Sequence, residues 1–139
     1  MSYLSPRNSP LASVFAGLPP PPVPLDQVWG DDGVDYRYRF AVYDIHAYPS
    51  AANAVYIFAA RQGLTYIPIY VGRAESLSRR LSSHERRDEA IRRGARYLLV
   101  HVPAVTDLIG YAEAERRLIR HYAPTLNEQH NLLPALLAR

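Results

Sequence analysis

The chain has 139 residues, of which 48% are hydrophobic and 21% are charged, and it contains no cysteine. This composition excludes a wholly disordered chain, disulfide bonds, thiolate metal sites and a cysteine nucleophile, and the length suits one compact domain. The longest apolar stretch, residues 97–105, is far shorter than the roughly 20 residues that span a bilayer. A secretory leader is not expected, because the short apolar run over 11–18 leads directly into four prolines. We therefore expect a soluble, cytoplasmic, single-domain protein with no membrane partner.

Positive charge is concentrated in the second part of the chain. All 16 basic residues are arginine: residues 1–50 hold three against five acidic residues, whereas residues 51–139 hold thirteen against eight. Residues 73–96 alone contain eight arginines and four acidic residues. This segment suits a phosphate-bearing partner, because the guanidinium fork matches phosphate geometry. On charge alone, however, a solvated helix surface with Glu–Arg pairs is the favoured interpretation of the same composition.

Seven elements are predicted in the order β-β-β-α-α-β-α. Residues 1–30 form a flexible, proline-rich arm, and the segment 31–53 holds a turn at Asp31-Asp32-Gly33, an extra strand and its connection onward. That strand, over 36–42, alternates aromatic residues with arginines and should be half-buried. The other elements are strands over 54–60, 65–72 and 97–102, and helices over 76–84, 88–93 and 106–122. This order predicts an α+β fold with a small, mainly antiparallel sheet flanked by helices.

Two tyrosines lie on the predicted hairpin of strands 54–60 and 65–72. If these strands pair symmetrically about Gly63, Tyr56 lies opposite Tyr70 and both phenols share one face of the sheet. A cross-strand tyrosine pair ordinarily indicates packing. Here, however, Gly72 ends the second strand and a helix begins near Ser76, so free amides at the helix start would suit a phosphate beside the tyrosines.

Three polar side chains are predicted on apolar helix faces. Arg80 and His84 share a stripe with two leucines, and Glu115 lies in the middle of the apolar face of the last helix. That face consists of Leu108, Tyr111, Ala112, Leu118, Ile119 and Tyr122. Burial of a lone charge is costly, so each charged group requires a partner or a ligand. Arg80 either binds an anion or snorkels to solvent; Glu115 either binds Mg²⁺ or pairs with Arg80 or another arginine.

Other catalytic chemistry lacks a motif in this chain. No Gly-x-Gly-x-x-Gly or Walker loop occurs, and no His-x-x-x-His pair indicates a zinc site. The remaining histidines are scattered, and we interpret each of them as an ordinary residue: His46, His101, His121 and His130.

Taken together, these residues resemble the GIY-YIG endonuclease family. Ala54-Val55-Tyr56 resembles the first motif and Tyr70-Val71-Gly72 the second, and the resemblance covers residues 54–127, just over half of the chain. Further matches are Arg73 for a lysine of the DNA-repair branch, Arg80 for the catalytic arginine, His84 for a His or Tyr, Glu115 for the metal-binding glutamate and Asn127 for the terminal asparagine. The chain departs from the pattern in Ala54, which replaces a glycine, and in Leu126, which replaces a common tyrosine.

The resemblance implies a metal-dependent DNA endonuclease with its catalytic domain over 54–130 and a tail over 131–139. Glu115 would bind one Mg²⁺ or Mn²⁺ ion, Tyr56 or Tyr70 would deprotonate or position the attacking water, and Arg80 would neutralise charge in the transition state. The remaining implied roles are assistance by His84 and Arg73, contacts to the DNA backbone by Arg73, Arg79 and Arg86, and support of the site by Gly72 and Asn127.

The implied partner is DNA, read through its backbone or its structure, with a homodimer as a further option. Two other hypotheses remain open at this point. The first is a catalytically silent nucleic-acid-binding module that keeps the same scaffold. The second is a purely structural protein, which would leave Arg80 and Glu115 without an explanation.

Overall fold

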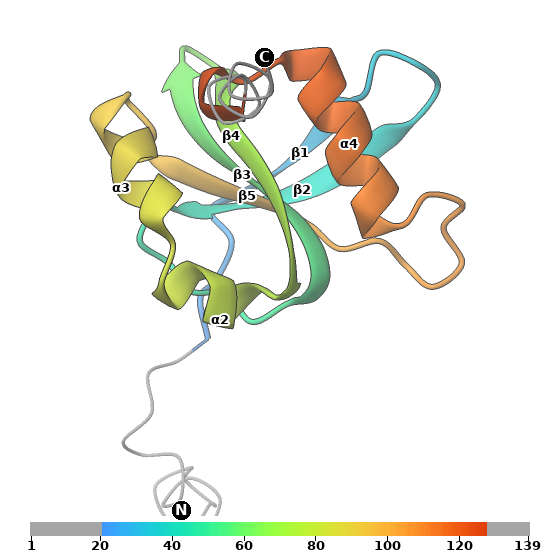
Figure 1. Cartoon of the computed structure of the whole chain (residues 1–139), viewed down its shortest axis with the longest axis horizontal. Helices are drawn as coiled ribbons and strands as arrows, with labels where there is room; N and C mark the ends of the chain where they lie inside the picture. The colour runs from blue at the N-terminus through green and yellow to red at the C-terminus, as the bar shows by residue number, and fades with distance from the viewer. Residues whose placement is uncertain (1–20, 128–139) are drawn as a thin grey trace, which may run out of the picture.

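The computed structural model describes residues 21–127 as a five-stranded antiparallel sheet with three helices. The strands are β1 (Asp26–Asp31), β2 (Arg37–Asp44), β3 (Ala52–Gln62), β4 (Thr65–Ser76) and β5 (Tyr97–His101), and the helices are α2 (Leu77–Ser82), α3 (Glu85–Arg92) and α4 (Tyr111–Tyr122). The strand order across the sheet is β1-β2-β5-β3-β4. Helix α4 packs on one face, and α2 and α3 pack on the other (Figure 1). The predicted α+β class is confirmed, and no helix of the described part is long and apolar enough to cross a membrane.

Strand β1 was not predicted from the sequence. Residues 26–30 were expected in the flexible arm, but they pair with β2 from Asp26 opposite Val42 to Asp31 opposite Arg37. The strand is an exposed sheet edge with a polar sequence, so it shows no hydrophobic alternation for a pattern to detect. Because β2 in turn pairs with β5, the segment 31–53 belongs to the same sheet as the rest. Most of the predicted arm and all of the predicted tail over 131–139 lie outside the described residues.

Each face of the sheet buries its own hydrophobic core. The core between the sheet and the helices α2 and α3 includes Tyr56 and Phe58 of β3 and Leu77 and Leu81 of α2. The core between the sheet and α4 includes Tyr38, Phe40, Val42 and Val71 of the strands and Leu118 of the helix. The alternation predicted over 36–42 is therefore confirmed, since its aromatic residues face α4 and its arginines lie on the opposite, exposed side.

Helix α4 begins later than predicted. Gly110 caps it rather than Thr106, because the preceding segment forms a turn in which the Asp107 carboxylate accepts the Ala104 amide at 2.7 Å. Leu108, which was expected on the apolar face, is 96% exposed and precedes the helix, and Ala112 is also exposed. The fully buried positions of α4 are Ala114 and Leu118, flanked by the partly buried Tyr111, Ile119 and Tyr122.

A buried carboxylate joins the β1–β2 turn to α4. Asp32 accepts the Tyr38 hydroxyl at 2.7 Å and the Val34 amide at 2.9 Å, and it lies 3.3 Å from the Arg117 guanidinium. Arg117 also pairs with Asp35 and Glu113. Burial alone would raise the pKa of Asp32, but the hydrogen bonds outweigh it and lower the pKa to about 2. The network fixes the turn against the helix.

Candidate active site

The β3–β4 hairpin brings both tyrosines onto one sheet face, but not opposite each other as predicted. Tyr56 pairs with Gly72, and Tyr70 pairs with Phe58. The turn has two residues, because Gln62 pairs with Thr65, and the register then shifts by one between Phe58 and Ala59. This shift leaves Ile69 as an extra residue on β4, next to Pro68, which suits an edge strand and a bulge since it donates no amide hydrogen. If the same residues paired without the bulge, Tyr70 would lie opposite Ile57 and face α4, and it would no longer share a face with Tyr56.

A directed chain of hydrogen bonds connects α3 to the two tyrosines. His84 caps the N-terminus of α3, where its Nδ1 accepts the Arg86 backbone amide at 3.1 Å. A ring nitrogen that accepts carries no proton, so the neutral His84 ring carries its proton on Nε2. This Nε2–H donates to the Tyr56 hydroxyl oxygen at 2.6 Å. Tyr56 in turn donates its own hydroxyl hydrogen to Tyr70, which raises the pKa of Tyr56 and lowers that of Tyr70.

Burial dominates the titration of these three groups. It raises the pKa of Tyr56 well above its usual range and raises that of Tyr70, which is only partly buried. Burial also lowers the pKa of His84 to about 3, with further lowering by the charges of Arg80, Arg87 and Arg86. His84 is therefore neutral at physiological pH, as the direction of its hydrogen bonds requires.

Arg80 and Glu115 lie close enough to act on both phenols. The charge of Arg80 lowers the pKa of Tyr56 and of Tyr70, whereas the charge of Glu115 raises both. Arg80 is partly buried and forms no ion pair with another described residue. The charges of Arg80 on α2 and Glu115 on α4 thus act on both tyrosines of the hairpin, although α4 lies far from the hairpin in the sequence.

The ionic neighbour of Glu115 is Arg73 on β4. Arg73 Nε lies 3.7 Å from Glu115 Oε1, and the two side chains are 52% and 23% exposed. The distance is beyond hydrogen-bond range, so the carboxylate oxygens keep free lone pairs. Burial raises the pKa of Glu115, and the nearby Arg73 charge lowers it. Glu115 was expected to pair either with Arg80 or with another arginine. Among the described residues its partner is Arg73.

The helix start predicted near Ser76 is confirmed, but the prediction that the strand ends at Gly72 is wrong. β4 continues four residues past Gly72 to Ser76, with Ala74 paired to Ala54 and Ser76 paired to Ala52. The Leu77 amide then donates to the Ala51 carbonyl at 2.9 Å, and α2 is only six residues long. The Leu77 amide, the first of α2, is therefore already bonded and not available to a phosphate.

Asn127 holds the outer edge of β4 at the tyrosine site. Its Oδ1 accepts the Val71 amide at 2.8 Å, and its Nδ2 donates to the Val71 carbonyl at 2.9 Å. The side chain therefore mimics a neighbouring strand for the one residue between Tyr70 and Gly72. The support that was predicted from Asn127 therefore consists of two hydrogen bonds to the backbone of Val71.

The three arginines expected to contact DNA differ in their availability. Arg79 is exposed on α2 and forms no ion pair with a described residue. Arg86 pairs with Glu89 at 2.9 Å, and Arg73 lies beside Glu115. The capping role of His84 was not predicted from the sequence, although Glu85 and Asp88, which follow it, are typical of a first helical turn.

Comparison with known proteins adds no relative. No protein-family model, curated protein or solved structure matches the chain. The residues of the site themselves therefore carry the functional argument. Among residues 21–127, no group of three or more histidine and acidic side chains is positioned to hold a metal ion.

Proposed function

We propose that the protein is a metal-dependent DNA endonuclease that hydrolyses a phosphodiester bond at the Tyr70–Arg80–Glu115 site. One observation supports this most strongly: the charges of Arg80 and Glu115 both act on the Tyr70 phenol, and all three side chains are partly buried. Phosphodiester hydrolysis requires a group that accepts a proton from water, a positive charge for the phosphate and a ligand for a divalent cation. The three side chains are chemically suited to these three tasks.

Of the two tyrosines, we assign proton abstraction from water to Tyr70. The Tyr56 oxygen is enclosed, since it accepts from His84 and donates to Tyr70. Tyr70 is partly exposed and receives the Tyr56 hydrogen bond, which stabilises its phenolate form. Arg80 stabilises that phenolate as well, because its charge lowers the Tyr70 pKa. Tyr56 and His84 then serve to orient and ionise Tyr70 rather than to meet the water.

The surroundings of Glu115 fit a hard divalent cation. Its carboxylate is partly buried and its neighbour Arg73 is beyond hydrogen-bond range, so both oxygens keep lone pairs for a ligand. Mg²⁺ needs only one or two protein carboxylates, since water and substrate phosphate complete its coordination. Glu115 would hold one Mg²⁺ or Mn²⁺ ion, which supplies positive charge to the scissile phosphate and the leaving oxygen. Arg80 would neutralise the charge that develops on the phosphate during attack.

The silent binding module remains the second candidate, because Arg73 already neutralises part of the Glu115 charge. Incubation of the protein with nicked, flapped, branched and plain DNA, each with Mg²⁺, Mn²⁺ or EDTA, distinguishes the two. We expect cleavage with metal and none with EDTA. DNA binding without cleavage under every metal condition would establish the silent module instead.

Glu115→Gln is the decisive variant, because it keeps the side-chain shape and removes the charge that holds the metal. We expect no cleavage and DNA binding at least as strong as in the wild type, since a carboxylate near the phosphate is gone. Glu113→Gln on the same helix is the matched control. It loses ion pairs with Arg116 and Arg117, so it should be slightly less stable yet fully active. Equal cleavage by the Glu115 variant would refute the metal-ligand assignment.

A further inference from the structure

The loop between β5 and α4, residues 102–110, exposes three aliphatic side chains. Val105 and Leu108 are fully exposed, and Val102 is about half exposed. Exposed apolar residues of a soluble domain are ordinarily scattered singly, whereas these three lie together within the segment 102–108. The proposed catalytic site uses none of them. An apolar group concentrated in this way indicates a surface that another molecule covers.

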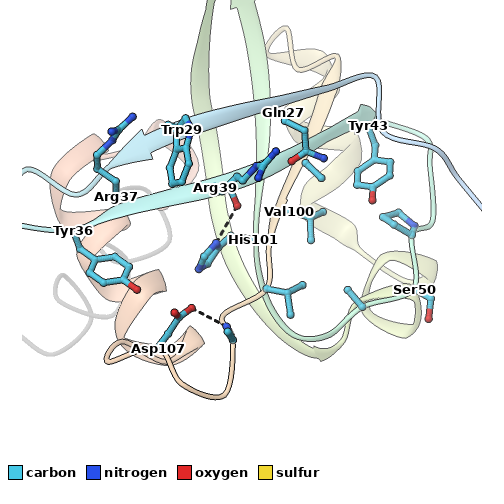
Figure 2. A pocket seen from close by; sticks show the side chains of 15 residues that line it. Gln27, Trp29, Tyr36, Arg37, Arg39, Tyr43, Ser50, Val100, His101 and Asp107 are labelled. Carbon is cyan, nitrogen blue, oxygen red and sulfur yellow. Dashed lines mark hydrogen bonds between the residues drawn. The ribbon is translucent and has the colours of Figure 1, made fainter.

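The β5–α4 loop is held in a defined conformation, so the exposure of its aliphatic side chains is part of the fold. The Asp107 carboxylate accepts the Ala104 amide at 2.7 Å, and the Asp107 amide donates to the Ala104 carbonyl at 3.0 Å (Figure 2). Ile109, the neighbour of Leu108, is buried in the core between the sheet and α4. The turn and this anchor together hold Val105 and Leu108 outward.

Positive charge lies beside this loop. Val102, Ala104 and Asp107 line a cavity of about 570 Å³ whose lining also includes Arg37 and Arg39 of β2 (Figure 2). Neither arginine forms an ion pair with a described residue, so both charges are available. Aliphatic side chains beside free guanidinium groups suit DNA, because apolar side chains wedge between base steps while arginines neutralise phosphates. A purely apolar partner would leave both arginines without a counter-charge.

The loop leads directly into the helix that carries Glu115. α4 begins at Tyr111, immediately after the loop, and Glu115 lies about 6 Å further along the helix axis. One turn of B-DNA spans about 34 Å, so a duplex that is bound at Glu115 extends well past the loop. The aliphatic side chains are therefore positioned to meet the same DNA molecule as the proposed catalytic site.

We propose that the β5–α4 loop is a wedge that inserts Val105 and Leu108 between stacked base pairs of duplex DNA and bends it. Arg37 and Arg39 contact phosphates beside the opened step. Unstacking a step costs free energy, and the cost is smallest where a mismatch already weakens the pairing. The inference rests on the proposed function for DNA as the partner. It adds the form of the substrate, which is duplex DNA with a locally weak base step.

Fluorescence of 2-aminopurine tests the wedge, because this base analogue brightens when it unstacks. The full chain is titrated in EDTA, which prevents cleavage, into a short duplex with 2-aminopurine beside a central mismatch and into the matched duplex. We expect saturable brightening of the mismatched duplex and an affinity at least about 3-fold higher than for the matched one, since the mismatch lowers the cost of unstacking. Energy transfer between dyes at the two duplex ends should increase on binding, because the wedge bends the DNA.

Two leucines of similar exposure provide a matched pair of variants. Leu108 in the loop is 96% exposed and Leu64 at the hairpin tip is 89% exposed, and the loop and the tip lie at opposite ends of the molecule (Figure 1). Leu108→Ala should lose most of the brightening and the preference for the mismatch, and adding Val105→Ala should remove the remainder. The salt dependence of binding should not change, because no charge is lost. Leu64→Ala should behave as the wild type does.

A charge variant checks the phosphate contacts separately. Arg39→Gln should weaken the binding of matched and mismatched DNA equally and reduce the slope of log affinity against log salt by about 1. Because Arg39, Val105 and Leu108 are all exposed, urea unfolding of these variants should match that of the wild type.

The outcomes separate this inference from the proposed function. Brightening that depends on Leu108, in a protein that cleaves no DNA, supports the wedge and rejects the nuclease. Cleavage by a protein that causes no brightening, or equal brightening by Leu108→Ala and the wild type, rejects the wedge. Sedimentation of the DNA-free chain is the last test: a dimer that Leu108→Ala dissociates would show that a second copy covers the loop and would overturn the assignment to DNA.

Discussion

Gly72 lies directly opposite Tyr56 in the β3–β4 ladder, and the Tyr56 phenol covers it. A Cβ at residue 72 would lie 2.5 Å from the Tyr56 hydroxyl oxygen and 2.9 Å from the Tyr70 ring. Gly72→Ala should therefore displace both phenols, cost about 1–3 kcal/mol of unfolding free energy and reduce cleavage. Urea unfolding and a cleavage assay measure the two effects. Gly110→Ala, whose Cβ would meet no atom within 4 Å, is the control, and equal behaviour of both variants would contradict the prediction.

The two tyrosines should differ in their kinetic behaviour. Because the pKa of Tyr70 is raised, its phenolate fraction and the cleavage rate should increase about 10-fold per pH unit in the neutral range. Tyr70→Phe should abolish cleavage together with this dependence. Tyr56→Phe removes the donated hydrogen bond, so the rate should fall at neutral pH while the slope remains. If the pH dependence of the rate were lost in Tyr56→Phe and kept in Tyr70→Phe, Tyr56 rather than Tyr70 would be the proton acceptor. Tyr66→Phe, on the same hairpin, is the control.

Neighbouring arginines on α2 should separate catalysis from binding. Arg80→Ala should reduce the cleavage rate a few hundred-fold, since stabilisation of transition-state charge by one group is often worth about 3–4 kcal/mol. Its effect on DNA affinity should be small. Arg79→Ala, on the exposed side of the helix, should weaken affinity and leave the rate at saturating DNA unchanged. Single-turnover kinetics measure both quantities, and the opposite pattern would place Arg79 rather than Arg80 at the reacting phosphate.

Affinity for DNA should depend steeply on salt and little on sequence, because phosphate contacts dominate in a domain of this size. Arg79→Ala should reduce the slope of log affinity against log salt by about 1. Arg86→Ala and Arg73→Ala should reduce it less, because Glu89 and Glu115 already neutralise part of these charges. Titrations between low and physiological salt measure the slopes. A flat dependence, or preference for one sequence by several orders of magnitude, would exclude backbone recognition.

Acidification should destabilise the fold in two separable pH windows. The folded pKa of His84 is about 3 against an ordinary value of 6.5, so the unfolded state takes up the proton first. Stability should therefore be full above pH 6.5 and decline as pH falls toward 3. His84→Asn, which can still cap α3, should flatten this window, with part of the slope retained by His101, whose pKa burial also lowers.

The lower window belongs to Asp32, whose folded pKa is about 2 against an ordinary value of 3.8. Its contribution is present above 3.8 and is lost as pH falls toward 2. Asp32→Asn should therefore change the pH dependence only below about pH 4. Urea unfolding across pH 7 to 2 measures both variants. If Asp32→Asn reduced the loss of stability between pH 6.5 and 3, or if His84→Asn did not reduce it, other groups would be the cause of the acid sensitivity.

Local periodicity predicted much of the fold and the site. The spacing of Tyr56 and Tyr70 placed both on one face, and the helical stripe placed Glu115 at a partly buried position, as observed. The pairing itself was wrong, because a two-residue turn and a one-residue bulge replace the assumed symmetry about Gly63. Neither feature has a hydrophobic pattern of its own.

Tertiary arrangement explains the remaining differences. The neighbour of Glu115 is Arg73 because α4 packs against β4, and the sequence contains no record of that crossing. β1 was missed because its pairing with β2 depends on backbone hydrogen bonds rather than on an apolar face. The bond between His101 Nδ1 and the Arg39 carbonyl likewise depends on the pairing of β5 with β2, which local periodicity does not predict.

The bulge at Ile69 allows the hairpin to tolerate both an insertion and a single deletion. An inserted residue at the exposed tip, Gly63-Leu64, simply lengthens a loop, and the pairing beyond it is unchanged. A residue deleted between the tip and Tyr70 is compensated by loss of the bulge, so the two-residue turn and the pair Phe58–Tyr70 are both kept. β4 then pairs with β3 without a bulge, and Tyr70, Gly72 and Ala74 stay on the face that carries Tyr56. The hairpin can therefore gain residues at its tip or lose one residue before Tyr70, whereas the loss of a second residue would turn Tyr70 toward α4 and dismantle the site.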